Sequence, residues 1–348
     1  MGRAKHRRTL ATLGVVAALG LLAWTFRHAQ LNQVTALLGR LHPAALPLVL
    51  LPYALAVGSE TWGWRNAILR LGHAVPFVGL LRVRLKTEAL SLTLPFGQLV
   101  CDSATAALLQ RGGLPVSAGV AAVGVRKYLL ALSQAWFLLV AFLVGHEALA
   151  QASQKLINST ALQWAPLVAA ITLGTVAIVF GSGLNRGALA TFTLRVLLRI
   201  PSEAFRRTLL RASPHFSATD ATLQRFFHRP VGLTQVAPIV LLWAMESVET
   251  WVILSLLGAR LSLAEVMSFE VLLSLARSLI VVVPAGLGIQ DLGYFTFFRA
   301  LGVVDPVSTA AAFSLLKRGK ELFWASIGYG LFALPRTFHL TPTTLTTN

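Results

Sequence analysis

The sequence contains apolar runs as long as a membrane span, and short segments between them hold most of the charge. A helix needs about 20 apolar residues to cross the hydrocarbon core of a bilayer. Hydrophobic residues make up 55% of the chain and charged residues only 12%, about half the charge of an ordinary soluble domain. We therefore predict an all-α, polytopic membrane helix bundle that forms a single integral membrane domain over residues 1–348. The predicted spanning helices lie at residues 10–27, 44–64, 118–145, 163–183, 232–258 and 307–334.

Two further apolar stretches, at about residues 77–111 and 264–301, contain proline and glycine near their middles. Proline and glycine weaken or break a helix, so neither stretch is a good single span. Irregular backbone is tolerated at membrane depth only where it is buried in protein or lines a cavity. We therefore predict a broken or re-entrant helix in each stretch.

The net charge of +17 gathers at the N-terminus, in the connection after the second predicted span and in the segment 184–231. Arginine and lysine favour the cytoplasmic side of a membrane, so we expect both termini there. We expect the first run to remain as a helix, because no small-residue cleavage site follows it. Within 184–231, arginine alternates with leucine and phenylalanine (RVLLRIPSEAFRRTLLR), which predicts a cytoplasmic basic amphipathic connection on anionic headgroups. A solvated basic loop is the alternative, and this charge placement does not favour nucleic acid.

The same pattern, Pro-x-Gly-x4-Asp, interrupts both broken stretches: PFGQLVCD at 95–102 and PAGLGIQD at 284–291. In each half an arginine, then Pro-Val-Ser, then a basic pair follow in the same order. The predicted topology places the two breaks after helices that end on opposite sides of the membrane. We therefore predict a first structural repeat at 10–145 and a second, inverted repeat at 163–335, the plan of many secondary transporters. The alternative is that proline and glycine only kink two ordinary helices.

Charged residues inside apolar stretches are costly in lipid and usually functional. Asp102 and Asp291 each lie seven residues after a proline, so they could face a central cavity between the breaks; local helix capping is the alternative. Amide groups freed at the glycines would suit an anion such as phosphate. Arg318 and Glu321 could pair at i, i+3. The predicted substrate-binding residues are Pro95, Gly97, Asp102, Arg126, Lys127, Pro284, Gly286, Gly288, Asp291, Lys317, Arg318 and Glu321, and further intramembrane charges are Glu60, Glu88, Glu246, Glu249, Glu270 and Arg277.

The sequence shows no nucleophile elbow, no phosphate-binding loop, no Cys/His metal pattern and no dinucleotide fingerprint. We therefore expect no catalytic residues, no metal and no cofactor, and we expect that the chain is not an enzyme. A membrane enzyme with sparse carboxylates is the alternative. The single cysteine, Cys101, lies in an apolar context that favours a structural thiol.

The stretch LARSLIVVVPAGLGIQDLGYFTFFRALGV, followed by AFSLLKRGKEL, resembles the flippase-like family built on the transmembrane region of lysylphosphatidylglycerol synthase. That family typically has Pro-Gly-Gly-Leu-Gly with an acid two residues on; here Asp291 stands where Glu is commoner, and Ala285 replaces a Gly. The first half, LTLPFGQLVCDSATAALLQRGG, is similar to the family's corresponding segment, and the resemblance covers about 45–335. The Ser-Leu-Ala-Arg-Ser and Lys-Arg-x-Lys-Glu segments look most like the subgroup associated with hopanoid biosynthesis.

The resemblance implies a role in handling lipid. Full-length relatives move aminoacylated phosphatidylglycerol between leaflets and carry a separate soluble synthase domain, which this sequence does not show. We therefore expect a bacterial cytoplasmic (inner) membrane protein that translocates a phospholipid or related polar lipid through a cavity between the repeats. The expected partners are anionic or phosphate-bearing membrane lipids, and a lipid-biosynthesis enzyme is a candidate partner. The alternatives are a membrane-embedded lipid-modifying enzyme or accessory subunit of a hopanoid or glycolipid pathway, and a small-solute secondary transporter.

Overall fold

The computed structural model describes residues 27, 29–94, 97–187, 189–199, 202–279 and 288–333. Within these ranges the chain is helical and contains no strand, which confirms the all-α class. The helices are α2 (Leu31–Gly39), η1 (Pro43–Ala45), α3 (Leu46–Arg70), α4 (Phe77–Thr93), α5 (Gly97–Arg111), α6 (Val116–Ile157), η2 (Ala161–Trp164), α7 (Ala165–Asn185), α8 (Leu189–Leu197), α9 (Glu203–Phe227), α10 (Leu233–Leu256), α11 (Leu263–Leu279), α12 (Ile289–Ala300) and α13 (Pro306–Ala333).

Four helical segments are long and apolar enough to cross a membrane: Pro43–Arg70, Val116–Ile157, Ala161–Asn185 and Leu233–Leu256. They coincide with the predicted spans that begin at residues 44, 118, 163 and 232. Large apolar side chains such as Ile171 and Ile178 are exposed along α7, as a lipid-facing helix requires. The chain is therefore a multi-pass helical membrane protein. The predicted span at 10–27 lies, apart from Arg27, outside the described residues.

Helix α13 matches the predicted span at 307–334 in its bounds and is 28 residues long. It differs from the four apolar segments because Lys317, Arg318, Lys320 and Glu321 lie in its middle. A helix with this many charges fits a membrane only where those charges are compensated inside the protein. These four residues therefore need oppositely charged partners within the protein.

Both apolar stretches with internal proline and glycine are broken, as the sequence predicts. The first forms α4 and α5, with Gly97 as the first residue of α5, and the second forms α11 and α12. Helix α12 begins at Ile289, after Gly288 with a φ of 77°. Asp291 therefore lies in the first turn of α12. Pro95, Pro284 and Gly286 lie outside the described residues.

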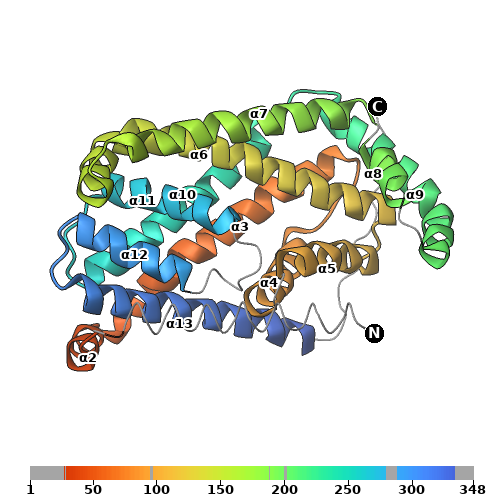
Figure 1. Cartoon of the computed structure of the whole chain (residues 1–348). Coiled ribbons are helices and arrows are strands. Elements are labelled where there is room, and N and C mark those ends of the chain that lie inside the picture. The colour runs from red at the N-terminus through yellow and green to blue at the C-terminus, as the bar shows by residue number, and fades with distance from the viewer. Residues whose placement is uncertain are drawn as a thin grey trace.

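Helices α3 and α10 form an antiparallel pair through the middle of the bundle, with α6 and α7 above them and α13 below (Figure 1). The Asn66 amide donates a hydrogen bond to the Thr234 carbonyl at 3.1 Å, and Arg70, farther along α3, donates to the Pro230 carbonyl at 3.0 Å. Gly63 allows this close approach, since a Cβ there would lie 2.9 Å from the Gln235 carbonyl oxygen. On either side of this pair, α4 packs on α13 and α11 packs on α6.

The basic segment 184–231 forms two helices, α8 and α9, which project from one end of the bundle (Figure 1). The Asp220 carboxylate joins them, because it accepts hydrogen bonds from the backbone amides of Ala190 at 2.8 Å and Thr191 at 2.9 Å. The segment is therefore not one continuous helix. Helix α8 ends at Leu197 and α9 begins at Glu203, and the sequence places Pro201, a helix-breaking residue, between them.

Candidate functional site

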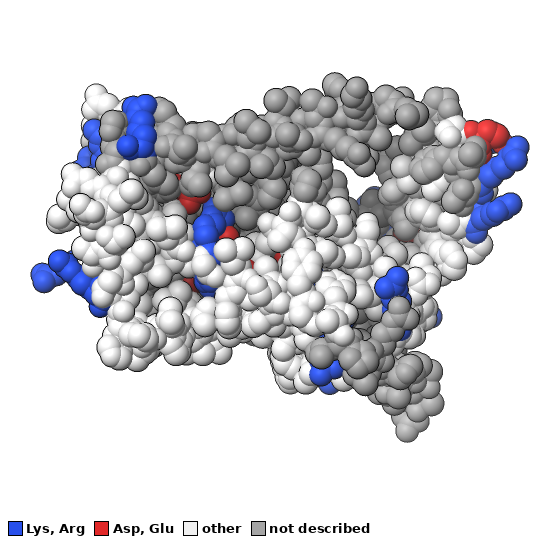
Figure 2. All heavy atoms as spheres, turned by 90° about the horizontal axis from the view of Figure 1, so that it is seen from below, with Lys and Arg blue, Asp and Glu red and all other residues white. Residues whose placement is uncertain are grey.

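Charged side chains that the sequence places inside apolar helices are paired with opposite charges on neighbouring helices. On the face of the molecule seen in Figure 2, basic and acidic side chains lie together at the bottom of a recess, apart from the charges at the ends of the molecule. Burying a charge without a partner costs far more than a bundle of this kind can supply. The arrangement of partners therefore determines which helices must stay together.

The first cluster joins α3, α4 and α6 through Glu60. One carboxylate oxygen of Glu60 accepts hydrogen bonds from Arg126 at 2.8 Å and 2.5 Å, and the other accepts from Arg84 at 2.7 Å. Arg84 also pairs with Glu88, one turn along α4. Glu60 is only 1% exposed. These two acids and two guanidinium groups balance, so the cluster is neutral and holds three helices together.

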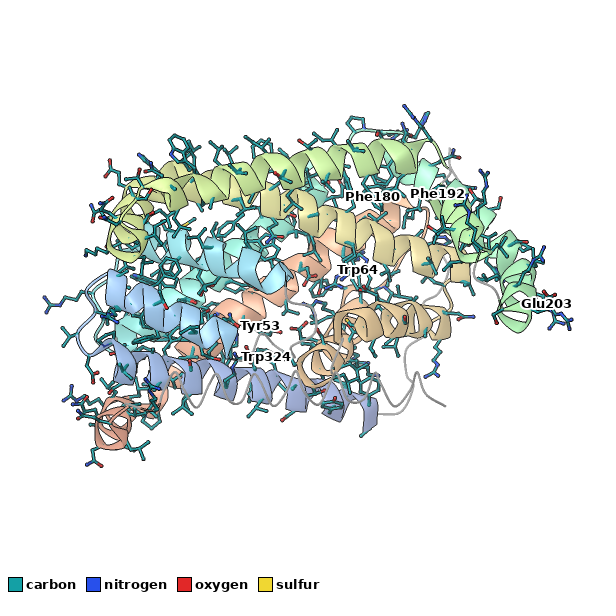
Figure 3. All side chains as sticks on the ribbon, in the orientation of Figure 1. Tyr53, Trp64, Phe180, Phe192, Glu203 and Trp324 are labelled. Carbon is teal, nitrogen blue, oxygen red and sulfur yellow. The ribbon has the colours of Figure 1, made fainter. Side chains whose placement is uncertain are left out.

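Arg126 also lies against an aromatic ring. Its guanidinium carbon is 5.4 Å from the ring centre of Trp64, which Figure 3 labels on α3. The Trp64 indole N–H donates to the Ala122 carbonyl on α6 at 2.9 Å, which fixes the ring beside the cation. An aromatic face adds electrostatic stabilisation to a desolvated guanidinium. Arg126 is thus a structural cation with both a carboxylate and a ring as partners.

Asp102 and Lys127 form an ion pair between α5 and α6, with Lys127 Nζ 3.1 Å from an oxygen of Asp102. This pair is more open than the Glu60 cluster, because the side chains of Asp102 and Lys127 are 28% and 40% exposed. Asp102 lies in the helix that follows the first break, and Lys127 lies in the long helix after it. An ion pair with this exposure can exchange partners with a charged ligand.

Asp291 forms the matching pair between α12 and α13, and it is 1% exposed. Its carboxylate accepts hydrogen bonds from Arg318 at 3.2 Å, from the Ser314 hydroxyl at 2.7 Å and from the backbone amide of Gly288 at 3.0 Å. Asp291 therefore caps α12 as well as facing a cation. Because the Gly288 amide already donates to Asp291, it is not free for a phosphate in this structure. Arg318 also donates to Glu321 at 2.7 Å, which confirms the i, i+3 pair.

A third cluster surrounds Lys317 at the meeting of α10, α11, α12 and α13. Lys317 Nζ lies 3.4 Å from a Glu270 oxygen and 3.4 Å from the Thr250 hydroxyl, and it also donates to Tyr294. The Tyr294 hydroxyl donates to Glu270 at 2.9 Å, and Thr250 donates to the same oxygen. Every group of this buried cluster has a hydrogen-bond partner, as desolvated polar groups require.

Lys320 connects the two halves of the chain. Its ammonium group lies 2.6 Å from Glu249 on α10 and 4.4 Å from the ring centre of Tyr53 on α3. Tyr53 in turn packs against Trp324, with ring centres 5.3 Å apart, where α3 and α13 approach each other in Figure 3. Helix α13 therefore contacts both α10 of its own half and α3 of the other half.

A family model described as the lysylphosphatidylglycerol synthase TM region matches residues 11–327. The chain belongs to this family. It is thus a multi-pass membrane protein of a lipid-related family, as the resemblance predicts. No curated protein matches the sequence. The match to the lysylphosphatidylglycerol synthase TM region includes both broken stretches and every ion pair described above.

In this member of the lysylphosphatidylglycerol synthase TM region family, acidic and basic residues form ion pairs at corresponding positions in the two halves of the chain. Asp102 pairs with Lys127 and Asp291 with Arg318, in each case between the helix after the break and the next long helix. Glu60 and Glu249 precede the two aspartates by the same number of residues, and each pairs with a cation of a long helix. The repeated motif of the sequence therefore corresponds to a repeated ion-pair arrangement.

Of the other predicted charges, Glu88 is paired with Arg84, and Glu246 is half-buried on α10. Arg277 lies in α11, but its side chain is outside the described part of the structure. Asp102 and Asp291 belong to separate ion pairs, one with Lys127 and one with Arg318. Among the described residues, no His, Cys, Asp and Glu side chains gather as a metal site.

Sequence reasoning missed Arg84, which it assigned to a basic cytoplasmic connection. The structure buries Arg84 within α4 because Glu60 and Glu88 compensate its charge. One signal was present, since Arg84 and Glu88 have the i, i+4 spacing of a helical ion pair. The sequence also does not show that Lys320 pairs with Glu249, and it offers no signal for the hydroxyl partners Tyr294, Thr250 and Ser314.

Proposed function

We propose that this protein translocates a phospholipid or related polar lipid between the leaflets of a bacterial cytoplasmic (inner) membrane, with both termini in the cytoplasm. The observation that carries the proposal is the matched pair of intramembrane ion pairs, Asp102–Lys127 and Asp291–Arg318, beside the two helix breaks. Charges at that depth are expensive and mark the path of a polar substrate more often than they serve packing. Membership of a lipid-related family supports lipid as the substrate.

The packing of the helices supports an inverted repeat. In such a repeat, α3 corresponds to α10, α4 to α11 and α6 to α13. The packing of α4 on α13 then has a counterpart in the packing of α11 on α6. The corresponding helices α3 and α10 run antiparallel, as an axis in the membrane plane requires. The α4–α5 and α11–α12 hairpins also enter the bundle from opposite ends in Figure 1. Such hairpins can open a central path to each side in turn.

The exposed ion pair of Asp102 and Lys127 can bind a polar headgroup on this path. Lys127 can transfer its contact from Asp102 to the phosphate of a headgroup, and Asp102 can then accept a hydrogen bond from a headgroup hydroxyl or amine. When the headgroup carries an ammonium group, each charge keeps an opposite charge beside it during such an exchange, which limits the desolvation cost at low dielectric. The buried clusters around Glu60 and Lys317 would hold the helices in place while the exposed pair exchanges partners.

Proteoliposomes provide the test. Purified protein is reconstituted into vesicles that contain labelled lipids with several headgroups, and their exchange between leaflets is followed by a membrane-impermeant quencher. We expect exchange above that of empty vesicles, and a loss of about tenfold or more in Asp102→Asn and Lys127→Gln, because each leaves a charge without its partner. Glu203→Gln, at the exposed tip of α9 in Figure 3, should transport normally. Exchange no faster than in empty vesicles for every headgroup would refute the proposal.

A lipid-modifying enzyme or accessory subunit is the second candidate, favoured by one observation. The Lys317, Tyr294 and Glu270 cluster holds an amine, a phenol and a carboxylate within hydrogen-bond reach, which are groups that can transfer protons. The resemblance to the hopanoid-associated subgroup makes a hopanoid or glycolipid step the reaction to examine. Deletion of the gene should then change the lipid products seen by mass spectrometry of total lipid, whereas a translocator changes only their distribution between leaflets.

A further inference from the structure

A cavity of about 670 Å³ opens at the end of the bundle opposite the α8–α9 hairpin. Its walls come from α2, from the connection 257–261 between α10 and α11, and from the connection 301–305 between α12 and α13. None of the ion pairs assigned above to the candidate site lines it. A cavity of about 300–1,000 Å³ is the usual size for a site that binds a small molecule or a headgroup.

The walls of this cavity are held in place by tertiary contacts. On α2, Val34 is buried against the α10–α13 core, and the Gln33 side chain accepts a hydrogen bond from the Ser308 hydroxyl at 3.1 Å. The other two walls turn sharply at Gly258 and Gly302, with φ values of 83° and 75°. These turns close the C-terminal ends of α10 and α12, where a residue with a Cβ is strained. The cavity is therefore part of the fold.

The cavity presents both signs of charge on a largely apolar surface. Arg40 and Arg260 line it, and neither guanidinium forms an ion pair within the described part of the chain. Asp305 lines it too, and one of its oxygens accepts from the Ser308 amide at 3.3 Å at the start of α13. The C-terminal ends of α10 and α12 add carbonyl oxygens with partial negative charge. Leucine and valine side chains supply the apolar part of the wall.

We propose that this cavity binds the headgroup of a zwitterionic phospholipid, one that carries a phosphate and an amine. Arg40 and Arg260 would hold the phosphate, since guanidinium groups donate strong charge-assisted hydrogen bonds to phosphate oxygens. Asp305 and the carbonyl ends of α10 and α12 would accept from the ammonium group. The apolar wall would contact the glycerol and first acyl carbons. This site lies at the ends of membrane helices, where headgroups lie, and it does not depend on the translocation proposed above.

The test uses native mass spectrometry of the full-length protein in detergent, with dioctanoyl phosphatidylethanolamine, dioctanoyl phosphatidylglycerol or inorganic phosphate as the probe. We expect the ethanolamine lipid to bind most tightly. The double variant Arg40→Gln with Arg260→Gln should weaken its binding about tenfold or more, because charged hydrogen bonds are lost. The control double variant, Arg111→Gln with Arg229→Gln, removes exposed arginines away from the cavity and should bind like the unaltered protein.

Asp305→Asn tests the contact with the ammonium group separately from the contact with the phosphate. Asparagine can still cap α13 and tolerates the φ of 45° at this position, so the fold is kept. The variant should lose the preference for ethanolamine over glycerol while it keeps phosphate-dependent binding. Equal binding of the two lipids by the unaltered protein, tight binding of inorganic phosphate alone, or undiminished binding by the double arginine variant would each overturn the proposal. The experiment measures binding and not movement between leaflets, so failure of the transport proposal leaves this result unaffected.

Discussion

At the scale of the residue, the sequence identifies the buried charges but few of their partners. The Arg318–Glu321 pair follows from helical spacing alone. Glu60, in contrast, pairs with arginines that are 24 and 66 residues away, and Lys320 with an acid 71 residues away. Such partners depend on how helices pack, which hydropathy and local spacing do not encode. For this reason the sequence does not predict the buried position of Arg84 or the acid that pairs with Lys320.

Glu60→Gln should destabilise the protein strongly. Glutamine keeps the shape of the side chain, but Arg84 and Arg126 then lose their shared carboxylate, and removing one partner of a buried ion pair typically costs about 3–5 kcal/mol. Thermal unfolding in detergent measures the effect as a lower Tm. Glu203→Gln is the matched control, because that carboxylate is 65% exposed and its ion pair with Arg207 contributes little. Equal Tm values for the two variants would contradict the role given to Glu60.

The two matched aspartates should differ in their contribution to stability. Asp291→Asn disturbs three hydrogen bonds of a side chain that is 1% exposed, while Arg318 keeps Glu321 as a partner, so we expect a loss of about 1–3 kcal/mol. Asp102→Asn affects a pair that is partly exposed, so we expect a loss of about 1 kcal/mol or less. Parallel unfolding curves in the same detergent compare them. A larger loss of stability for Asp102→Asn than for Asp291→Asn would contradict the greater exposure of the Asp102–Lys127 pair.

At the scale of the element, apolar runs and proline–glycine breaks predicted most helices and both interruptions. They missed α2 and the full length of α6, which continues to Ile157 although the predicted span stops at 145. After residue 145 the sequence HEALAQASQKLI is less apolar but rich in good helix formers, so the helix extends after the hydropathy signal falls. Asn158, with a φ of 53°, then ends it. Hydropathy therefore finds membrane segments better than it finds helix ends.

The packing of α4 on α13 depends on a glycine that the sequence alone does not mark. A Cβ at Gly328 would lie 2.4 Å from the Leu85 carbonyl oxygen and 2.7 Å from the Ala89 Cβ. Gly328→Val should therefore push the helices apart and cost about 1–3 kcal/mol, measured as a lower Tm. Gly330→Val on the same helix is the control, because a Cβ there meets nothing within 4 Å. Equal Tm values for the two variants would contradict the close contact between α4 and α13 at Gly328.

At the scale of the whole molecule, the family and the all-helical membrane architecture follow from the sequence, and the structure adds how the halves engage. Helices α4 and α11 each pack on the last long helix of the opposite half, so neither half forms a closed bundle by itself. Lys320 and Tyr53 reinforce this exchange with a direct contact between halves. Movement of one hairpin therefore alters a surface of the other half, which is the coupling that a two-sided transporter needs. The Pro-x-Gly-x4-Asp repeat marked the hairpins but could not show this exchange.

The proposed inverted arrangement predicts which side of the membrane each hairpin reaches. In a Cys101→Ser background, Gln110→Cys near the end of α5 should react with an impermeant maleimide only from the cytoplasmic side. Val304→Cys, at a residue 88% exposed beside α12, should react only from outside. Thr160→Cys between α6 and α7 should behave like Val304→Cys, and His228→Cys before α10 like Gln110→Cys. Labelling of intact cells and of inverted vesicles compares the two sides. Reaction of Gln110→Cys and Val304→Cys from one side would mean that the repeats run parallel, and the paired hairpins could not then open to opposite sides in turn.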